Sequence, residues 1–163
     1  MKSMYVSVLT NSTQGRRHPM EFQDNQHCFV CGKHNPHGLH LDFQAEGAGG
    51  VRTTYIIPDR FQGFAGIVHG GILATILDEC MVNTVWLRGM TAVTARFEVR
   101  LRHPVRLGER VTFRAQVIRE SARGFEVESG AELDDGTVVA EGKALLVKVG
   151  GEAKRLLTEH DAK

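Results

Sequence analysis

Hydrophobic and polar residues alternate along much of the chain, and one long stretch in its middle is apolar on nearly every side. Alternation with a period of two is typical of a strand with one buried face. This pattern predicts six strands, at 39–43, 51–57, 95–101, 111–117, 125–133 and 138–149. Glycine-rich or Asp-rich turns separate most of them, and Pro58 ends the second strand.

The apolar stretch predicts a helix over about 70–87, which Gly89 ends. A helix that is apolar all round lies in the centre of a fold. The strands after it are joined by short turns, and short connections indicate an antiparallel sheet. We therefore expect an α+β domain in which an antiparallel sheet of five to six strands wraps around one long central helix.

Composition excludes several classes of protein. The 163 residues are 42% hydrophobic and 24% charged, with a formal net charge of +1. This length and apolar content suit one domain with a real core, whereas nucleic-acid-binding domains carry a strong basic excess. No apolar run approaches the roughly 20 residues needed to cross a bilayer. The N-terminus lacks the apolar centre of a signal peptide, so we expect a cytoplasmic protein with no membrane or nucleic-acid partner.

The first 37 residues are polar and irregular, so we expect an N-terminal arm over 1–37 and a single domain over 38–163. The arm contains Cys28 and Cys31 in the motif CFVCG, and the chain has three cysteines, too few for a disulfide framework. We favour a structural turn with buried thiols and expect no metal and no cofactor. A zinc site or a redox pair is also open. The histidines near the pair are His27, His34 and His37.

The predicted helix begins with Gly70 and Gly71. Helix N-termini leave backbone N–H groups without partners, and glycine lets a ligand approach them closely. The pair is therefore suited to an oxyanion hole, which binds the negative oxygen that develops in acyl transfer. The alternative is that the two glycines serve only to pack the helix tightly against the sheet.

Asp78 lies in the middle of the apolar helix, where an ionised carboxylate is costly without a partner or a task. It follows Gly71 by seven residues, about 10 Å along the axis, which is too far for both to act on one carbonyl carbon. Cooperation would need a second, antiparallel copy of the helix in a two-fold dimer. Asp78 could instead form a salt bridge or a cap. We expect the adjacent Glu79 to be a solvated or paired surface group, and Thr94 to position water or to be an ordinary strand residue.

The run GIVHGGILATILD at 66–78, then Val93-Thr94, then HPVRLGER at 103–110 resembles the hotdog-fold acyl-CoA thioesterases. The closest similarity is to the phenylacetate-degradation (PaaI-like) and 4-hydroxybenzoyl-CoA thioesterase branch, over about residues 38–149. The resemblance implies a hotdog domain in a homodimer, or a dimer of dimers. It also implies an acyl-CoA or aryl-CoA substrate and no cofactor.

Residue by residue, the resemblance implies that Asp78 is the general base or the nucleophile and that the Gly71 N–H binds the thioester oxygen. It places His69 beside that oxyanion hole and gives Thr94 the task of positioning water or the base. The implied reaction is attack of water on the thioester carbonyl, with Asp78 from one subunit and Gly71 from the other. A well-aligned backbone donor contributes about 3–4 kcal/mol to such a step.

The substrate-binding residues expected beside this centre include Gly70. Many relatives carry Asn or Gln shortly before the glycine pair, where this chain has Gln62 and Gly63. Either Gln62 takes that role from one residue away or the role is absent. Two other functions are alternatives: a non-catalytic acyl-CoA-binding or regulatory hotdog module, and a hotdog dehydratase or hydratase. The second would need a different catalytic motif from His-Gly-Gly and Asp78.

Charge is distributed unevenly over the predicted strands. Eight arginines and three acids lie between residues 96 and 123, and six acids with no lysine or arginine lie between 124 and 141. Cross-strand pairing on a solvated sheet face explains this pattern. A functional alternative is that some arginines bind the phosphates of coenzyme A. The arginines assigned to that role are Arg100, Arg102 and Arg106.

Overall fold

The computed structural model describes residues 22 and 24–149. The rest of the predicted arm and the last part of the predicted domain lie outside the described residues. The elements are β1 (Gln44–Glu46), β2 (Gly50–Ile56), a 3-10 helix (Asp59–Phe61), α1 (Gly70–Trp86), β3 (Ala92–Leu101), β4 (Arg110–Glu120), β5 (Gly124–Leu133) and β6 (Val138–Lys148). No helix in this part of the chain is long and apolar enough to span a membrane.

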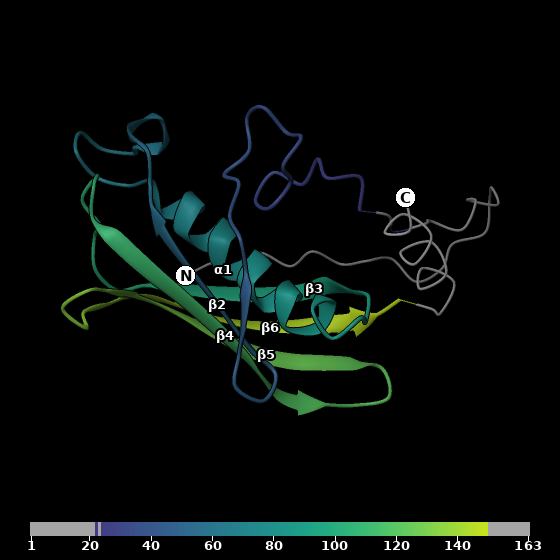
Figure 1. Ribbon diagram of the computed structural model, residues 1–163. Coiled ribbons are helices and arrows are strands. Elements are labelled where there is room, and N and C mark those ends of the chain that lie inside the picture. Colours follow the sequence, from purple (N-terminus) through teal and green to yellow (C-terminus); the bar gives the residue numbers. More distant parts are fainter. Residues whose placement is uncertain (1–21, 23, 150–163) are drawn as a thin grey trace, which may run out of the picture.

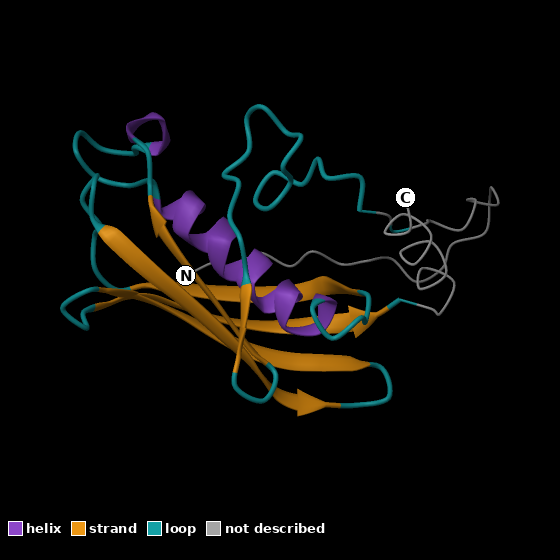
Figure 2. Ribbon diagram, viewed as in Figure 1, coloured by secondary structure: helices purple, strands orange, loops and turns teal. Residues whose placement is uncertain are grey.

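The six strands form one antiparallel sheet in the order β1-β2-β4-β5-β6-β3. The sheet curves around α1, which lies along its inner face (Figures 1 and 2). The α+β class, the strand number and the central helix predicted from the sequence are therefore confirmed. The sheet leaves β1 and β3 as its edge strands.

The core lies between α1 and the sheet, as the alternation predicts. Ile76, Leu77 and Met81 on α1 are fully buried, and they share one cluster with Phe113 of β4 and Phe125 of β5. Each fully buried side chain of this size stabilises the fold by about 1.5–3 kcal/mol. This packing fixes the rotation of α1, and with it the direction in which each polar residue on the helix points.

The side of α1 that faces away from the sheet is covered by residues 24–43, which we call the N-terminal segment (Figure 1). Val30, Leu39 and Leu41 are buried and belong to the same core as the helix. The helix therefore lies between the sheet and this segment. The apolar character of both helix faces is explained by this double cover.

The strand predicted at 39–43 is wrong. Leu39 and Leu41 are buried, as the alternation requires, but His40 between them has a positive φ of 57°, which no regular strand contains. The Leu39 N–H donates to the Phe29 carbonyl (2.8 Å) and the Leu41 N–H to the Val30 carbonyl (2.9 Å). The segment is thus paired with the cysteine-containing turn, and the first strand begins only at Gln44.

A β-bulge interrupts β3. Thr94 pairs with Leu146 and Arg96 with Leu145, so Ala95 is an extra residue without its own partner on β6. A bulge reverses the direction of alternate side chains on the two sides of the insertion. In a regular strand, even- and odd-numbered residues would point to opposite faces of the sheet. Because of the bulge, Thr94 points toward α1, and Phe97 and Val99 also contact the core.

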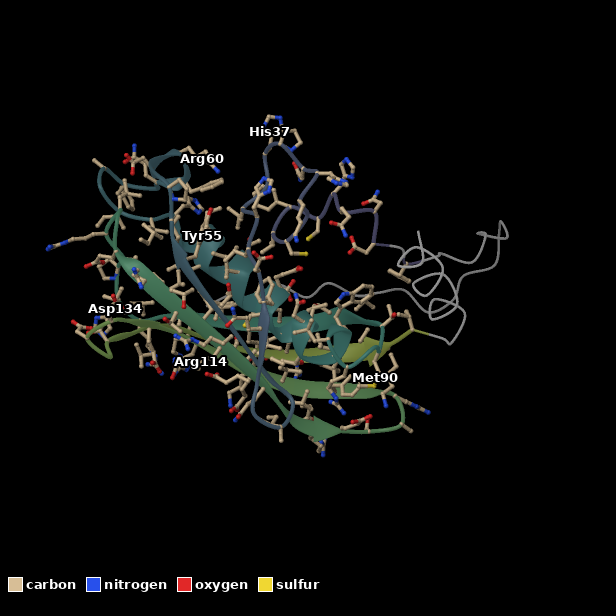
Figure 3. The ribbon with its side chains drawn as sticks, viewed as in Figure 1. His37, Tyr55, Arg60, Met90, Arg114 and Asp134 are labelled. Atoms are coloured by element: carbon tan, nitrogen blue, oxygen red, sulfur yellow. The ribbon has the colours of Figure 1, made fainter. Side chains whose placement is uncertain are left out.

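The outer face of the sheet carries ion pairs between strands. Arg114 contacts Glu46 on one side and Glu132 on the other, at 3.3 and 3.4 Å. Figure 3 shows Arg114 on the face turned away from α1. Cross-strand pairing is thus confirmed as an explanation of the uneven charge. Further ion pairs between strands are Arg119–Glu126 and Lys143–Glu128. Two more, Arg102–Glu141 and Arg110–Asp134, each join a strand to a residue just beyond the end of another strand.

Candidate active site

The loop before α1 is held rigidly by backbone hydrogen bonds. The His69 N–H donates to the Phe61 carbonyl and the Val68 N–H to the Val105 carbonyl, both at 2.9 Å. The Gln62 side-chain oxygen accepts a hydrogen bond from the Gly66 N–H at 3.2 Å. Gln62 therefore closes its own loop. The tip of this loop is Phe64, which is 86% exposed.

His69 is the N-cap of α1, and its Nδ1 accepts a hydrogen bond from the Gly71 N–H at 2.9 Å. The Gly71 N–H, which the family resemblance assigns to the oxyanion hole, is therefore already paired. The Gly70 N–H, by contrast, donates to no acceptor within the part of the chain that the structure describes. The donor left available at the start of α1 is therefore the Gly70 N–H.

The same hydrogen bond determines the tautomer of His69. Because Nδ1 accepts, a neutral ring must carry its proton on Nε2. The residue is exposed, so this second N–H is accessible from solvent. The start of α1 thus offers two neighbouring donors, one from the backbone and one from an imidazole.

A side chain at any of the glycines around His69 would meet a close neighbour. A Cβ on Gly70 would lie 2.5 Å from Leu101 Cδ1, and one on Gly63 would lie 3.2 Å from the His69 Cα. A Cβ on Gly71 would approach His69 Nδ1 to 2.9 Å. Tight packing and ligand access are therefore compatible explanations, and both apply to Gly70.

Asp78 and Thr94 contact each other. The Thr94 hydroxyl donates to Asp78 Oδ1 at 2.8 Å, and both residues are half-buried. No lysine, arginine or histidine among the described residues forms an ion pair with Asp78, so the salt-bridge alternative is not observed. Thr94 is likewise more than an ordinary strand residue, because the bulge at Ala95 turns its hydroxyl toward the helix.

Burial raises the pKa of Asp78 above its ordinary value. The Thr94 hydroxyl acts in the opposite direction because it stabilises the ionised form, and the negative charge of Glu79 adds a smaller upward shift. A carboxylate with a raised pKa is a better proton acceptor than an exposed aspartate. This is the property that a general base needs.

Glu79 was expected to be a solvated or paired surface group, but it is not at the surface. It is half-buried under the cysteine-containing turn, where the Cys28 thiol lies 3.6 Å from its Oε1. Both Cys28 and Cys31 are half-buried free thiols. Burial, together with the nearby Glu79, raises the pKa of Cys31 well above its usual range. The Cys-x-x-Cys motif was the sequence signal for this cluster, but nothing in the sequence linked it to Glu79.

The three arginines assigned to coenzyme A differ in their surroundings. Arg102 is held by Glu141, which accepts from its Nε at 2.8 Å and its Nη2 at 2.6 Å. Arg100 and Arg106 form no ion pair with any residue that the structure describes. Arg106 also pairs through its backbone with Ile67, so it lies beside the loop that leads into α1.

Comparison with known proteins agrees with this architecture. A sequence profile described as the Thioesterase superfamily matches residues 65–140, the segment from the loop before α1 into β6. Among solved structures, the PaaI protein of the E. coli phenylacetic acid degradation operon is 19% identical with a TM-score of 0.65. The match covers 69% of this chain and 82% of that one.

Two further structures are similar. A thioesterase superfamily protein, RHA08564, is 26% identical with a TM-score of 0.70, over 75% of this chain and 60% of that chain. The smu.793 protein of Streptococcus mutans, solved with bound acetyl-CoA, is 19% identical with a TM-score of 0.63, over 68% of this chain and 89% of that chain.

The profile match and the structural neighbours agree with the resemblance drawn from the sequence: the chain has the hotdog fold, and over residues 65–140 it is similar to the Thioesterase superfamily. More particularly, its neighbours include PaaI-like thioesterases. Together these comparisons support thioester hydrolysis as the general activity.

Proposed function

We propose that this protein hydrolyses acyl-CoA or aryl-CoA thioesters in a homodimer whose two active sites each combine residues of both subunits. The observation that carries the proposal is the hydrogen bond between Thr94 and Asp78. It holds a half-buried carboxylate that lacks a positive partner among the described residues, and it leaves the second carboxylate oxygen for a water molecule or the substrate. A thioester ligand is supported by the acetyl-CoA bound to the Streptococcus mutans protein.

The thioester oxygen binds at the start of α1 in this proposal. We assign the backbone donor to Gly70 instead of Gly71, because the Gly71 N–H is already bonded to His69. We assign the Nε2–H of His69 as a second donor. Such donors act where negative charge develops in the tetrahedral intermediate, and one of them contributes about 3–4 kcal/mol.

Asp78 supplies the attacking group, either by removing a proton from water or by attacking the carbonyl carbon itself. It lies eight residues beyond Gly70, about 12 Å along the helix axis, so both cannot act on one carbon from the same helix. The carboxylate must therefore come from the partner subunit. In this arrangement Thr94 is a positioning residue, since it orients the carboxylate without touching the substrate.

A thiol-release assay over a panel of acyl- and aryl-CoA substrates tests the activity. We expect Asp78→Asn and Asp78→Ala to lower kcat by about 10²–10⁴-fold, the usual contribution of a general base. Asp134→Asn, the same chemical change in the exposed turn between β5 and β6, is the matched control and should leave kcat unchanged. Full activity in both Asp78 variants would exclude its catalytic role. Tight CoA binding without hydrolysis would favour the non-catalytic module.

The donor assignment has its own test. Proline lacks an N–H but is favoured in the first turn of a helix, and His69 already has the extended backbone that a residue before proline needs (φ −66°, ψ 127°). The Leu101 Cδ1 that an added Cβ would meet at 2.5 Å is the end of a flexible, exposed side chain that can move aside. Gly70→Pro should therefore fold while losing at least about 100-fold in kcat. An unchanged kcat would refute the assignment.

The shared site is tested by mixing two inactive proteins. A heterodimer of Asp78→Asn with Gly70→Pro contains one intact site only if each site combines residues of both subunits. We expect the mixture to regain thiol release, whereas neither homodimer is active. No regain in a verified heterodimer, or a strictly monomeric wild-type protein in gel filtration, would contradict the arrangement.

For the phosphates of coenzyme A we propose Arg106, because it lies beside the loop before α1 and forms no ion pair with a described residue. Arg100 is the next candidate, while Arg102 is already held by Glu141. Arg106→Ala should raise KM for CoA substrates with little change in kcat. Arg123→Ala, at the opposite end of β4, is the control. An equal KM in both variants would remove Arg106 from the binding site.

A further inference from the structure

The proposed hydrolysis leaves one cluster of reactive side chains unused. The Cys-x-x-Cys turn lies against the middle of α1 and brings both its sulfur atoms toward Glu79. The two sulfurs and a carboxylate oxygen of Glu79 lie within 4.8 Å of one another. All three residues are half-buried, and the cysteines are not joined by a disulfide.

The spacing of these atoms matches a tetrahedral metal site. Zinc binds sulfur at about 2.3 Å and carboxylate oxygen at about 2.0–2.2 Å, so neighbouring ligands around it are roughly 3.3–3.8 Å apart. The Cys28 sulfur is 3.6 Å from Glu79 Oε1. The three ligand atoms therefore need only small side-chain adjustments to share one ion.

The cysteine-containing turn is already shaped for this task. The Val30 N–H donates to the Cys28 sulfur at 3.4 Å, which fixes the position of that sulfur. The Gly32 N–H donates to the Cys28 carbonyl at 3.0 Å, and a Cβ on Gly32 would lie only 2.4 Å from the Cys28 nitrogen. Only glycine fits there, so the two sulfur atoms are held on the same side of a tight turn.

The carboxylate is also held in place. The Asn83 side-chain nitrogen donates to Glu79 Oε1 at 3.3 Å and to the Glu79 carbonyl at 2.9 Å. Asn83 is buried, one turn further along α1. Residues that bind a metal ligand in this way orient it and increase metal affinity.

We propose that Cys28, Cys31 and Glu79 bind a zinc ion, with a water molecule as the fourth ligand. Two sulfur ligands on a fixed turn select zinc over magnesium or calcium, which prefer oxygen. His27 is not part of the ligand set, because only Cys28, Cys31 and Glu79 have ligand atoms within 4.8 Å of one another in this cluster. The ion ties the N-terminal segment to α1, one residue from Asp78.

Metal content tests the proposal without reference to hydrolysis, so its failure is separate from failure of the proposed function. The full-length protein, kept reduced, is stripped with a chelator and titrated with Zn²⁺ and with Co²⁺. We expect one ion per chain, and for cobalt the intense visible bands of a tetrahedral site with sulfur charge-transfer bands. Zinc should also raise Tm reversibly, because an ion that binds only the folded state stabilises it.

Cys28→Ser and Cys31→Ser should lose the cobalt bands, while Cys80→Ala, which alters the cysteine outside the cluster, should keep them. Glu79→Gln, which preserves size, should bind at least about 10-fold more weakly and with an altered cobalt spectrum. Wild-type protein that binds no more metal than Cys28→Ser would overturn the site. So would a Glu79→Gln protein with unchanged affinity and spectrum. These comparisons use the wild-type chain as well, so an unfolded variant does not decide the result.

Discussion

Replacing Thr94 with valine removes one hydroxyl and almost nothing else, because the two side chains have nearly the same shape. The hydroxyl donates to Asp78 Oδ1 at 2.8 Å. A hydrogen bond to a charged group contributes about 1.5–3 kcal/mol, and the partial exposure of Asp78 places this one near the lower value. Because the hydroxyl stabilises the ionised carboxylate, the pKa of Asp78 should rise in Thr94→Val.

The sign follows from which form the hydroxyl stabilises. It donates to the ionised carboxylate, so it lowers the pKa of Asp78 against the larger upward effect of burial. Without it, a more alkaline solution is needed to ionise Asp78. The acid limb of the profile of kcat/KM against pH should therefore move to higher pH, and on that limb the loss of about 1.5 kcal/mol corresponds to a fall of about 10-fold in kcat/KM.

Two measurements check this result. The first is the pH profile of thiol release for wild type, Thr94→Val and Thr94→Ser, all in the same metal state. The second is a carbon-13 NMR titration of the Asp78 carboxyl, which needs no turnover. Serine keeps the hydroxyl and should restore the wild-type profile. If valine leaves both the acid limb and the NMR titration unchanged, Thr94 does not control the ionisation of Asp78.

Three further predictions concern stability. Burial raises the pKa of Asp78, so the folded protein loses stability as the pH rises through that pKa. Asp78→Asn avoids this loss, and its Tm advantage over wild type should therefore grow from acidic to neutral pH. A Tm difference that stays constant with pH would contradict this expectation. Ser129→Ala should stabilise the protein by about 1 kcal/mol, or about 3 °C in a thermal melt, because the Ser129 hydroxyl is buried without a partner among the described residues; a lower Tm would indicate a partner. Gly124→Ala should lower the free energy of unfolding by about 3 kcal/mol or more, because its Cβ would lie 2.0 Å from the Leu146 carbonyl oxygen. Gly130→Ala on the same strand meets nothing within 4 Å and should lower it by less than about 1 kcal/mol. Equal losses in denaturant unfolding would refute this reasoning.

The helix and most strands were predictable from the sequence because each depends on a local pattern. The apolar run at 70–87 and the alternation around Phe113 and Phe125 are confirmed by burial in one core. The first predicted strand failed for the same reason. Alternation reports which side chains are buried, but it does not report whether a neighbouring strand is available for pairing, and His40 leaves the extended conformation.

The candidate site was predictable in part. Asp78 stood out because a carboxylate in an apolar helix needs a reason, and the family resemblance linked it to Thr94. The alternation alone would have placed Thr94 on the outer face with Arg96, because nothing in the sequence reveals the bulge at Ala95. The hydrogen bond from the Gly71 N–H to His69 could not be predicted from the sequence either, because it depends on the side-chain rotamer of His69.

Glu79 illustrates a different limit. Its neighbour Asp78 points toward Thr94 of β3, while Glu79 points toward Cys28 of the N-terminal segment. Cys28 precedes Glu79 by 51 residues in the chain. Sequence spacing within a helix gives the angle between two side chains, but it does not show what covers the second one. Only the fold brings Cys28 and Glu79 together.

The bulge in β3 allows Phe97 to be buried and Thr94 to face the helix, which a regular strand would not allow together. Through one additional residue, Ala95, the strand keeps Phe97 in the core and still presents Thr94 to the helix. Deleting Ala95 would restore regular pairing and force a choice, because either the hydroxyl or the aromatic ring would then turn to solvent. A change in length at this position would therefore alter the site without replacing any residue in it.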